Sequence, residues 1–124
     1  MRVCGARELF EETGMRVDAA QLVWTSHWIT PVGVPKRFDT FFFLAKIGRG
    51  IDATLNEEAV DAAWIEPADA IGTLQIVFPT RKNLEAIIGF ATADELIASR
   101  QGVDIPTIQP LMVTSDGRTK FTLP

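Results

Sequence analysis

The chain has 124 residues, of which 47% are hydrophobic, and this length and composition fit a single compact domain spanning residues 1–124. Its formal net charge of −4 argues against a protein that coats nucleic acid through charge alone, because such domains are usually basic. One cysteine, Cys4, excludes an intramolecular disulfide, and no apolar run approaches about 20 residues, so we expect a cytoplasmic protein without a membrane span.

The first half of the chain predicts one helix followed by two strands. The helix covers Arg2–Thr13 and ends at Gly14, a residue that often terminates helices. The strands cover Gln21–Thr30 and Arg37–Ile47, with a loop at residues 32–35 between them. Because the second strand is apolar on both faces, we expect it to be central in the sheet and covered on both sides.

The second half alternates strand and helix signals and ends in a hairpin. The predicted elements are a strand at Ala59–Ile65, a helical turn at Pro67–Ile71, helices at Thr80–Phe90 and Thr92–Gln101, and two short strands around Ser115–Arg118. Thr92 and Glu95 have the spacing of a capping box, and Gly102 is a suitable stop for the last helix. This order predicts an α+β fold in which helices cover a mixed sheet.

The first helix separates acidic from apolar residues. At about 100° per residue, Glu8, Glu11 and Glu12 share one arc of the helix surface. The predicted packing face on the other side contains Val3, Ala6, Leu9, Phe10 and Thr13. The sequence therefore predicts a helix that packs on one side and presents three carboxylates on the other.

This arrangement of carboxylates is unfavourable for a purely structural helix. Glu8 repels Glu11 and Glu12 at a cost of roughly 0.2–0.5 kcal/mol per pair, and the dipole disfavours anions in the last turn. Only Arg7 compensates, by reaching Glu11 four residues on. A divalent cation such as Mg²⁺ would reverse the balance. The alternative is a solvated acidic face, which spacing alone favours.

The segment Arg7-Glu8-Leu9-Phe10-Glu11-Glu12-Thr13-Gly14-Met15 resembles the signature of the Nudix hydrolases. It matches the last nine positions of that signature without a gap: Arg-Glu-apolar-any-Glu-Glu-any-Gly-apolar. The earlier part of the signature, a glycine loop with a further Glu, would lie before Met1. The resemblance implies an α/β/α sandwich with a mixed sheet, here expected to be N-terminally truncated.

Other segments are similar to one Nudix branch, that of the peroxisomal coenzyme A diphosphatase and its bacterial relatives. These segments are Arg2–Phe10, His27–Pro31, Lys36–Thr40 and Pro79–Leu84. The similarity covers most of the chain but is looser outside the signature. It implies a nucleoside-diphosphate substrate, with coenzyme A or an acyl-CoA as the leading expectation and ADP-ribose and NADH as alternatives.

The resemblance also implies roles for individual residues. Glu8 and Glu12 would be the main ligands of Mg²⁺ or Mn²⁺, with Glu11 as a third ligand and Arg7 holding the carboxylates through Glu11. One of these carboxylates, or Glu58, would activate the attacking water. The alternative for Glu58 and its neighbour Glu57 is an exposed loop pair.

Three more positions have both a functional and a structural interpretation. Lys36 and Arg37 could bind substrate phosphates, or could be the solvated start of a strand. His27, the only histidine, is expected to be structural because it lies between aromatic residues on a strand. Asp39 is expected to orient Arg37 or to pair with it.

Three functional hypotheses follow. The chain is an active Nudix hydrolase, a Nudix-like module that binds a nucleotide without cutting it, or a truncated product of a longer active enzyme. The third hypothesis predicts unpaired sheet edges and exposed apolar surface near Phe41–Leu44, and therefore a homodimer with weak activity. A small-molecule substrate is expected in each case, without nucleic acid or membrane partners.

Overall fold

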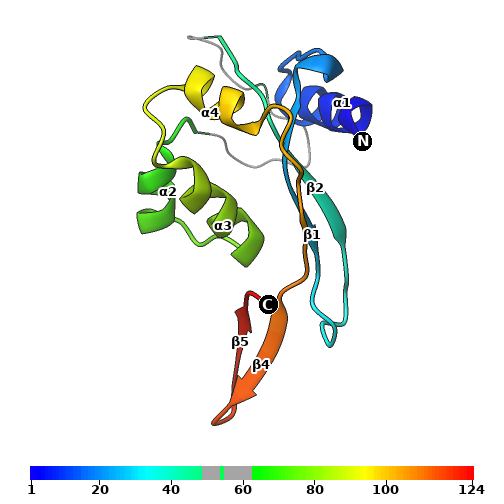
Figure 1. The fold of residues 1–124 in the computed structure, drawn as a ribbon, viewed down its shortest axis with the longest axis vertical. Helices are drawn as coiled ribbons and strands as arrows, with labels where there is room; N and C mark the ends of the chain where they lie inside the picture. Colours follow the sequence, from blue (N-terminus) through cyan, green and yellow to red (C-terminus); the bar gives the residue numbers. More distant parts are fainter. Residues whose placement is uncertain (49–53, 55–62) are drawn as a thin grey trace.

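The computed structural model describes residues 1–48, 54 and 63–124 of the chain (Figure 1). Its main sheet has three strands in this described part. These are β1 (Val23–Ile29), β2 (Asp39–Leu44) and β3 (Thr107–Ile108), in the order β2-β1-β3. β1 is antiparallel to β2 and parallel to β3. The predicted α+β class and mixed sheet are therefore confirmed.

The predicted central position of β2 is wrong for the part of the chain that the structure describes. There β2 pairs only with β1, and β1 is the middle strand because the distant β3 joins its other side. The apolar residues of β2 are half-buried and meet different layers. Phe43 contacts the first helix near Gly5, while Phe42 lines a small cavity with Asn83 of a later helix.

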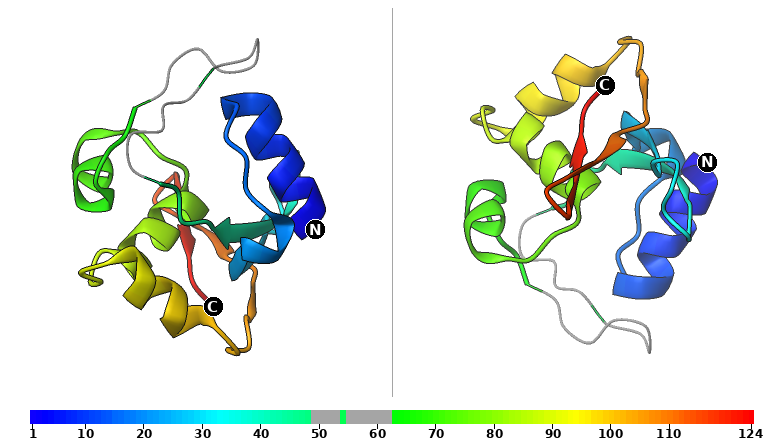
Figure 2. Two further views of the ribbon diagram at one scale, coloured as in Figure 1. Left: turned by 90° about the horizontal axis from the view of Figure 1, so that it is seen from above. Right: turned by 90° about the horizontal axis from the view of Figure 1, so that it is seen from below.

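Helices lie on both sides of this sheet (Figure 2). α1 (Arg2–Thr13) is on one side, with the short 3-10 helix η1 (Ala19–Gln21) after it. On the other side lie α2 (Pro67–Thr73), α3 (Phe78–Ile87) and α4 (Ala93–Arg100).

Local signals at the helix ends explain their bounds. Thr92 accepts a hydrogen bond from the Glu95 amide at the start of α4, and Gly102 follows its end with φ 67°, as expected. α3 begins at Phe78, two residues before the predicted start, because Pro79 fits the first turn of a helix.

α1 packs less completely than its sequence predicted. Ala6, Leu9 and Thr13 are half-buried as expected, but Val3 is 74% exposed and Phe10 40% exposed. The packed side is instead turned towards Gly5, which lies next to Leu22 and Phe43. The buried apolar residues in the described part of the chain are Met15, Leu22, Val23, Trp28 and Ala70.

The C-terminal hairpin forms a second sheet of its own. β4 (Leu111–Ser115) and β5 (Arg118–Thr122) are antiparallel, as predicted. Asp116 and Gly117 connect them with φ values of 51° and 74°, a pair of positive values that suits a two-residue hairpin turn. Met112 of β4 lies against Gly33 in the β1–β2 loop, where a Cβ atom would come within 2.5 Å of the Met112 methyl group.

The predicted strand at Ala59–Ile65 falls mostly outside the described residues. Its last three residues, Ala63, Trp64 and Ile65, are described and are not in a strand. α2 then begins at Pro67, where the helical turn was expected. Within the described ranges, no helix has the length and apolar character needed to cross a membrane.

Candidate functional site

The three carboxylates of α1 lie on its solvent side. Glu8, Glu11 and Glu12 are all exposed, as the helical spacing predicted. The helix ends at Gly14, whose φ of 72° lets its amide donate to the Phe10 carbonyl at 2.8 Å. The last turn of α1 has no basic residue, so no side chain of that turn offsets the unfavourable interaction of Glu11 and Glu12 with the helix dipole.

Arg7 pairs with one carboxylate of this acidic face. Its Nε lies 3.7 Å from Glu11 Oε1, which is the ion pair predicted from the spacing. The two side chains are 63% and 58% exposed, so solvent screens the pair and it contributes at most about 0.5 kcal/mol. The pair therefore orients Glu11 more than it stabilises the helix.

Cys4 joins the same cluster, which the sequence interpretation missed. Its thiol donates to Glu8 Oε1 at 3.7 Å and accepts from Arg7 Nη2 at 3.5 Å. The signal was available in the spacing, since Cys4 precedes Arg7 by three residues and Glu8 by four on one helix. Glu12 has no polar side-chain partner within the described ranges.

The donor chemistry of this face suits a hard divalent cation. Carboxylate oxygens are the ligands that Mg²⁺ prefers, and Mg²⁺ usually binds one or two carboxylates and keeps several waters. Among the described residues, no group of three or more His, Cys, Asp or Glu side chains is gathered closely enough to hold a metal ion. The face thus offers two adjacent carboxylates, Glu8 and Glu12, with Glu11 engaged by Arg7.

The carboxylate expected from elsewhere in the chain, Glu58, lies outside the described residues, as does Glu57. Thr54, which is described, reaches the C-terminal end of α1. Its amide donates to the Thr13 carbonyl at 2.6 Å, and its Cβ would lie 3.2 Å from a side chain placed at Gly14. The role of Glu58 in activating water stays a prediction.

The two predicted phosphate-binding residues have different surroundings. Arg37 donates from Nε and Nη2 to the Thr30 carbonyl, at 3.3 and 3.1 Å, so its guanidinium fastens the β1–β2 hairpin. Lys36 is exposed, and its ammonium lies 5.4 Å from the centre of the Phe38 ring. Lys36 is the freer of the two cations for a ligand.

Lys36 also borders a cavity of about 390 Å³. The cavity lies between the β1–β2 hairpin, the start of α3 and the β4–β5 hairpin, and its wall is mainly apolar and aromatic, including Trp28, Phe42, Phe78 and Phe121. Trp28 and Phe78 meet edge to face at 5.9 Å. Its size and lining are typical of small-molecule sites.

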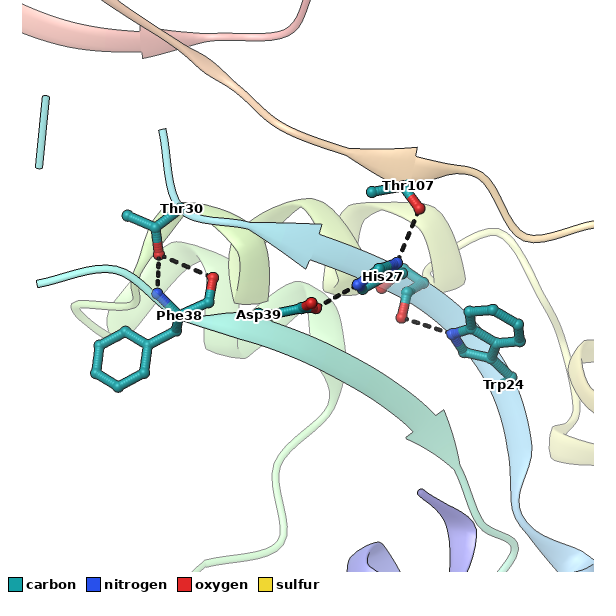
Figure 3. Close-up of polar contacts among 7 residues, drawn as sticks. Trp24, His27, Thr30, Phe38, Asp39 and Thr107 are labelled. Atoms are coloured by element: carbon teal, nitrogen blue, oxygen red, sulfur yellow. Dashed lines mark hydrogen bonds and ion pairs between the residues drawn. The ribbon is translucent and has the colours of Figure 1, made fainter. Parts of the chain in front are cut away.

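Asp39 pairs with His27 rather than with Arg37, which corrects the sequence expectation (Figure 3). The cross-strand register explains the difference: His27 and Asp39 are two pairs apart along β1 and β2, while Arg37 lies beyond the strand and turns back to Thr30. On its other side, His27 Nδ1 is 2.8 Å from Thr107 Oγ1 of β3.

His27 is held on several sides, as its structural interpretation predicted. Its side chain is 12% exposed and stacks on Phe41, with ring centres 4.1 Å apart and an angle of 8° between the planes. Because both ring nitrogens are engaged, the residue links all three strands of the main sheet. His27 does not line the cavity beside Lys36 or the small cavity between Phe42 and Asn83.

Comparisons with models of known protein families, with curated proteins and with solved structures found no match to this chain.

Proposed function

We propose that this chain is a Nudix-type hydrolase that splits the diphosphate bond of a nucleoside-diphosphate derivative with the help of Mg²⁺ or Mn²⁺. The observation that carries the proposal is the segment Arg7–Met15, which matches the second part of the Nudix signature. Its three glutamates are exposed on one helix, where they face solvent instead of being used in packing. A local arrangement that is unfavourable without a ligand is typical of a functional site.

The arrangement of layers is compatible with this proposal. α1 lies on one side of a mixed sheet, and α3 and α4 lie on the other (Figure 2). We extend the observed α+β class to the α/β/α sandwich of the Nudix family as part of the same proposal.

In the proposed reaction, water attacks one phosphorus and the bridging P–O bond breaks, which releases a nucleoside monophosphate or another phosphate ester. The divalent ion would offset negative charge on the diphosphate and make water more acidic. Glu8 and Glu12 would hold the ion, and Glu11, oriented by Arg7, would be a third ligand. One carboxylate of this set, or Glu58, would accept the proton of the attacking water.

The substrate class is proposed from the resemblance and supported by one cavity. Coenzyme A or an acyl-CoA is the leading candidate, followed by ADP-ribose and NADH. All of them combine a diphosphate with a large organic body. The aromatic cavity of about 390 Å³ beside Lys36 lies at the other end of the β1–β2 hairpin from α1, so in this proposal it accepts a part of the body that is remote from the diphosphate (Figure 1).

The second candidate function is a module that binds a nucleotide without cutting it. The observation that favours it is that the described carboxylates of α1 are not gathered into a group of three potential ligands. In that case Lys36 and the neighbouring cavity would still bind the nucleotide, whereas substitution of Glu12 would leave binding unchanged.

We further propose that the chain forms a homodimer. Val3 at the start of α1 is 74% exposed, and it borders a hollow on the sheet side with Trp24, Phe41 and Phe43. A second copy of the chain could cover Val3, Phe41 and Phe43, none of which lines the cavity that contains Arg100, because exposed apolar patches are typical of protein–protein interfaces.

The proposed activity can be tested by incubating the protein with Mg²⁺ and, in turn, coenzyme A, ADP-ribose, NADH and a dinucleoside polyphosphate. We expect release of a monophosphate from at least one of them. Glu12→Gln should lower the rate by at least about 100-fold, because a metal ligand is lost. The matched control is Glu95→Gln, an exposed glutamate on α4. A well-folded protein that hydrolyses none of the four would favour the binding module.

A further inference from the structure

A second cavity of about 390 Å³ lies on a different part of the molecule, and two arginines that are distant in the sequence line it. Arg2 comes from the first turn of α1 and Arg100 from the last turn of α4. The rest of the wall is mostly neutral and includes Leu22 and Trp24 at the start of β1 and Val103 and Ile105 after α4.

Both arginines are held in place through their Nε atoms by neutral acceptors. Arg2 Nε donates to the Leu22 carbonyl at 3.0 Å, and Arg100 Nε donates to Thr25 Oγ1 at 3.3 Å. These contacts fix the stems of the side chains and leave the terminal NH₂ groups, which point donors in the plane of each guanidinium, available to a ligand.

The cavity has no acidic group to balance these charges. None of its lining residues is Asp or Glu, and over the described ranges neither arginine forms an ion pair. The first turn of α1 also has no acidic residue, so the positive end of its dipole adds to the same potential. A cavity with two unpaired cations is unusual in a chain whose net charge is −4.

We propose that this cavity binds the phosphate group of a small organic phosphate, with Arg2 and Arg100 donating to its oxygens. Two guanidinium groups match the geometry of a tetrahedral oxyanion, and hydrogen bonds between ionised partners are among the strongest in proteins. The apolar part of the wall, with the Trp24 ring, takes the organic body of the ligand. This site goes beyond the proposed hydrolase, because it uses no residue of the acidic face of α1 and needs no metal ion.

The test uses AMP, adenosine and inorganic phosphate as probes in the presence of EDTA, with calorimetry as the readout. AMP should bind, inorganic phosphate should bind more weakly, and adenosine should show no binding because it lacks the phosphate. Arg100→Gln and Arg2→Gln should each weaken AMP binding by at least about 10-fold, since each removes a charged hydrogen-bond donor. Arg16→Gln is the matched control, because Arg16 lies over the Phe10 ring on another surface.

Two further variants keep the result decisive. Arg100→Lys retains the charge but not the planar fork, so its affinity should be intermediate, and it serves if Arg100→Gln does not fold. Glu12→Gln should bind AMP like the unmodified protein, which separates this site from the proposed metal site. The proposal is overturned if AMP does not bind to the unmodified protein, or if the Arg2 and Arg100 variants bind it with unchanged affinity.

Discussion

Glu12 differs from the other two carboxylates of α1 in its contacts. Glu8 accepts from the Cys4 thiol and Glu11 pairs with Arg7, whereas Glu12 has no side-chain partner in the described part of the chain. Its charge repels Glu8 one turn earlier and the negative end of the helix dipole. Glu12 therefore slightly destabilises the protein without metal, and its carboxylate is available to bind a cation.

Glu12→Gln should accordingly change stability and metal binding in opposite directions. Without metal, the free energy of unfolding should rise by a few tenths of a kcal/mol, roughly the size of one repulsive pair. The affinity for Mn²⁺ should fall at least about 10-fold. Urea denaturation measures the change in stability. Calorimetry measures the change in Mn²⁺ affinity, with Glu95→Gln as the control for metal binding. Equal Mn²⁺ affinity in the variant would contradict the metal assignment.

Ser26 is the buried polar residue of the described core, with 7% of its surface exposed. Its hydroxyl donates to Asn83 Oδ1 of α3 at 2.6 Å and accepts from Trp28 Nε1 at 3.1 Å. These two bonds connect the middle strand to the helix layer. Asn83 Nδ2 is buried without a partner within the described residues, so the network depends on the hydroxyl.

Ser26→Ala should lower the free energy of unfolding by about 1–3 kcal/mol, because it leaves the Asn83 carbonyl and the Trp28 indole N–H without their partner. Chemical denaturation measures the difference. Ser115→Ala, at an exposed position in β4, is the control and should change stability by less than about 0.5 kcal/mol. A loss no larger than that of the control would mean that water replaces the hydroxyl at no cost.

Among the elements, β3 depends most on a single side chain. It consists of two residues, Thr107 and Ile108, paired with His27 and Trp28 of β1. His27 bonds to Thr107 on this side and to Asp39 of β2 on the other (Figure 3). A two-residue parallel pairing is weak, so the polar chain through His27 is a large part of what holds β3.

His27→Phe keeps an aromatic ring against Phe41 but removes both polar contacts. It should lower the free energy of unfolding by about 1–3 kcal/mol and speed hydrogen exchange at Ile108. Thr107→Val removes one of the two contacts and should have a smaller effect on both measurements. If exchange in β3 does not change in His27→Phe, the backbone pairing alone is sufficient.

The ends of elements that have local sequence signals were predictable from the sequence. Which elements pair with one another in space was not. Gly14, Thr92 and the Asp116-Gly117 pair mark ends and turns through their own backbone preferences, and the structure has α1, α4 and the β4–β5 hairpin at those places. Among the described residues, β1 is the middle strand because it pairs with residues 107–108, which are far away in the sequence, and no local pattern specifies that pairing.

The same distinction applies to the candidate site. The exposure of Glu8, Glu11 and Glu12 follows from helical periodicity, as does the Arg7–Glu11 pair. The pairing of Asp39 with His27 depends on the register of β1 and β2. A shift of one residue would place the two side chains on opposite faces of the sheet. Arg2 and Arg100 line one cavity because the ends of two helices that are distant in the sequence lie near the start of β1, and no local pattern specifies that arrangement. Neither feature was therefore predicted.

At the scale of the whole molecule, apolar exposure predicts self-association. We expect light scattering to report a dimer, because Val3 is 74% exposed beside a hollow lined by Phe41 and Phe43. Val3→Glu should shift the protein towards the monomer by placing a charge in the proposed interface. Val32→Glu is the matched control, since Val32 is 71% exposed on the β1–β2 loop. A protein that stays monomeric at high micromolar concentration would contradict the dimer.

The separation of β4 and β5 from the main sheet has a kinetic consequence. An isolated two-stranded hairpin is marginally stable, and this one rests on the rest of the fold through contacts such as Phe121 with Phe78 and Met112 with Gly33. Its strands should therefore detach and return many times for each complete unfolding event. Limited proteolysis should cut first near Asp116 and Gly117. Phe121 forms part of the wall of the cavity beside Lys36, so a ligand bound in that cavity should hold the hairpin in place. Proteolysis should then be slower than in the ligand-free protein.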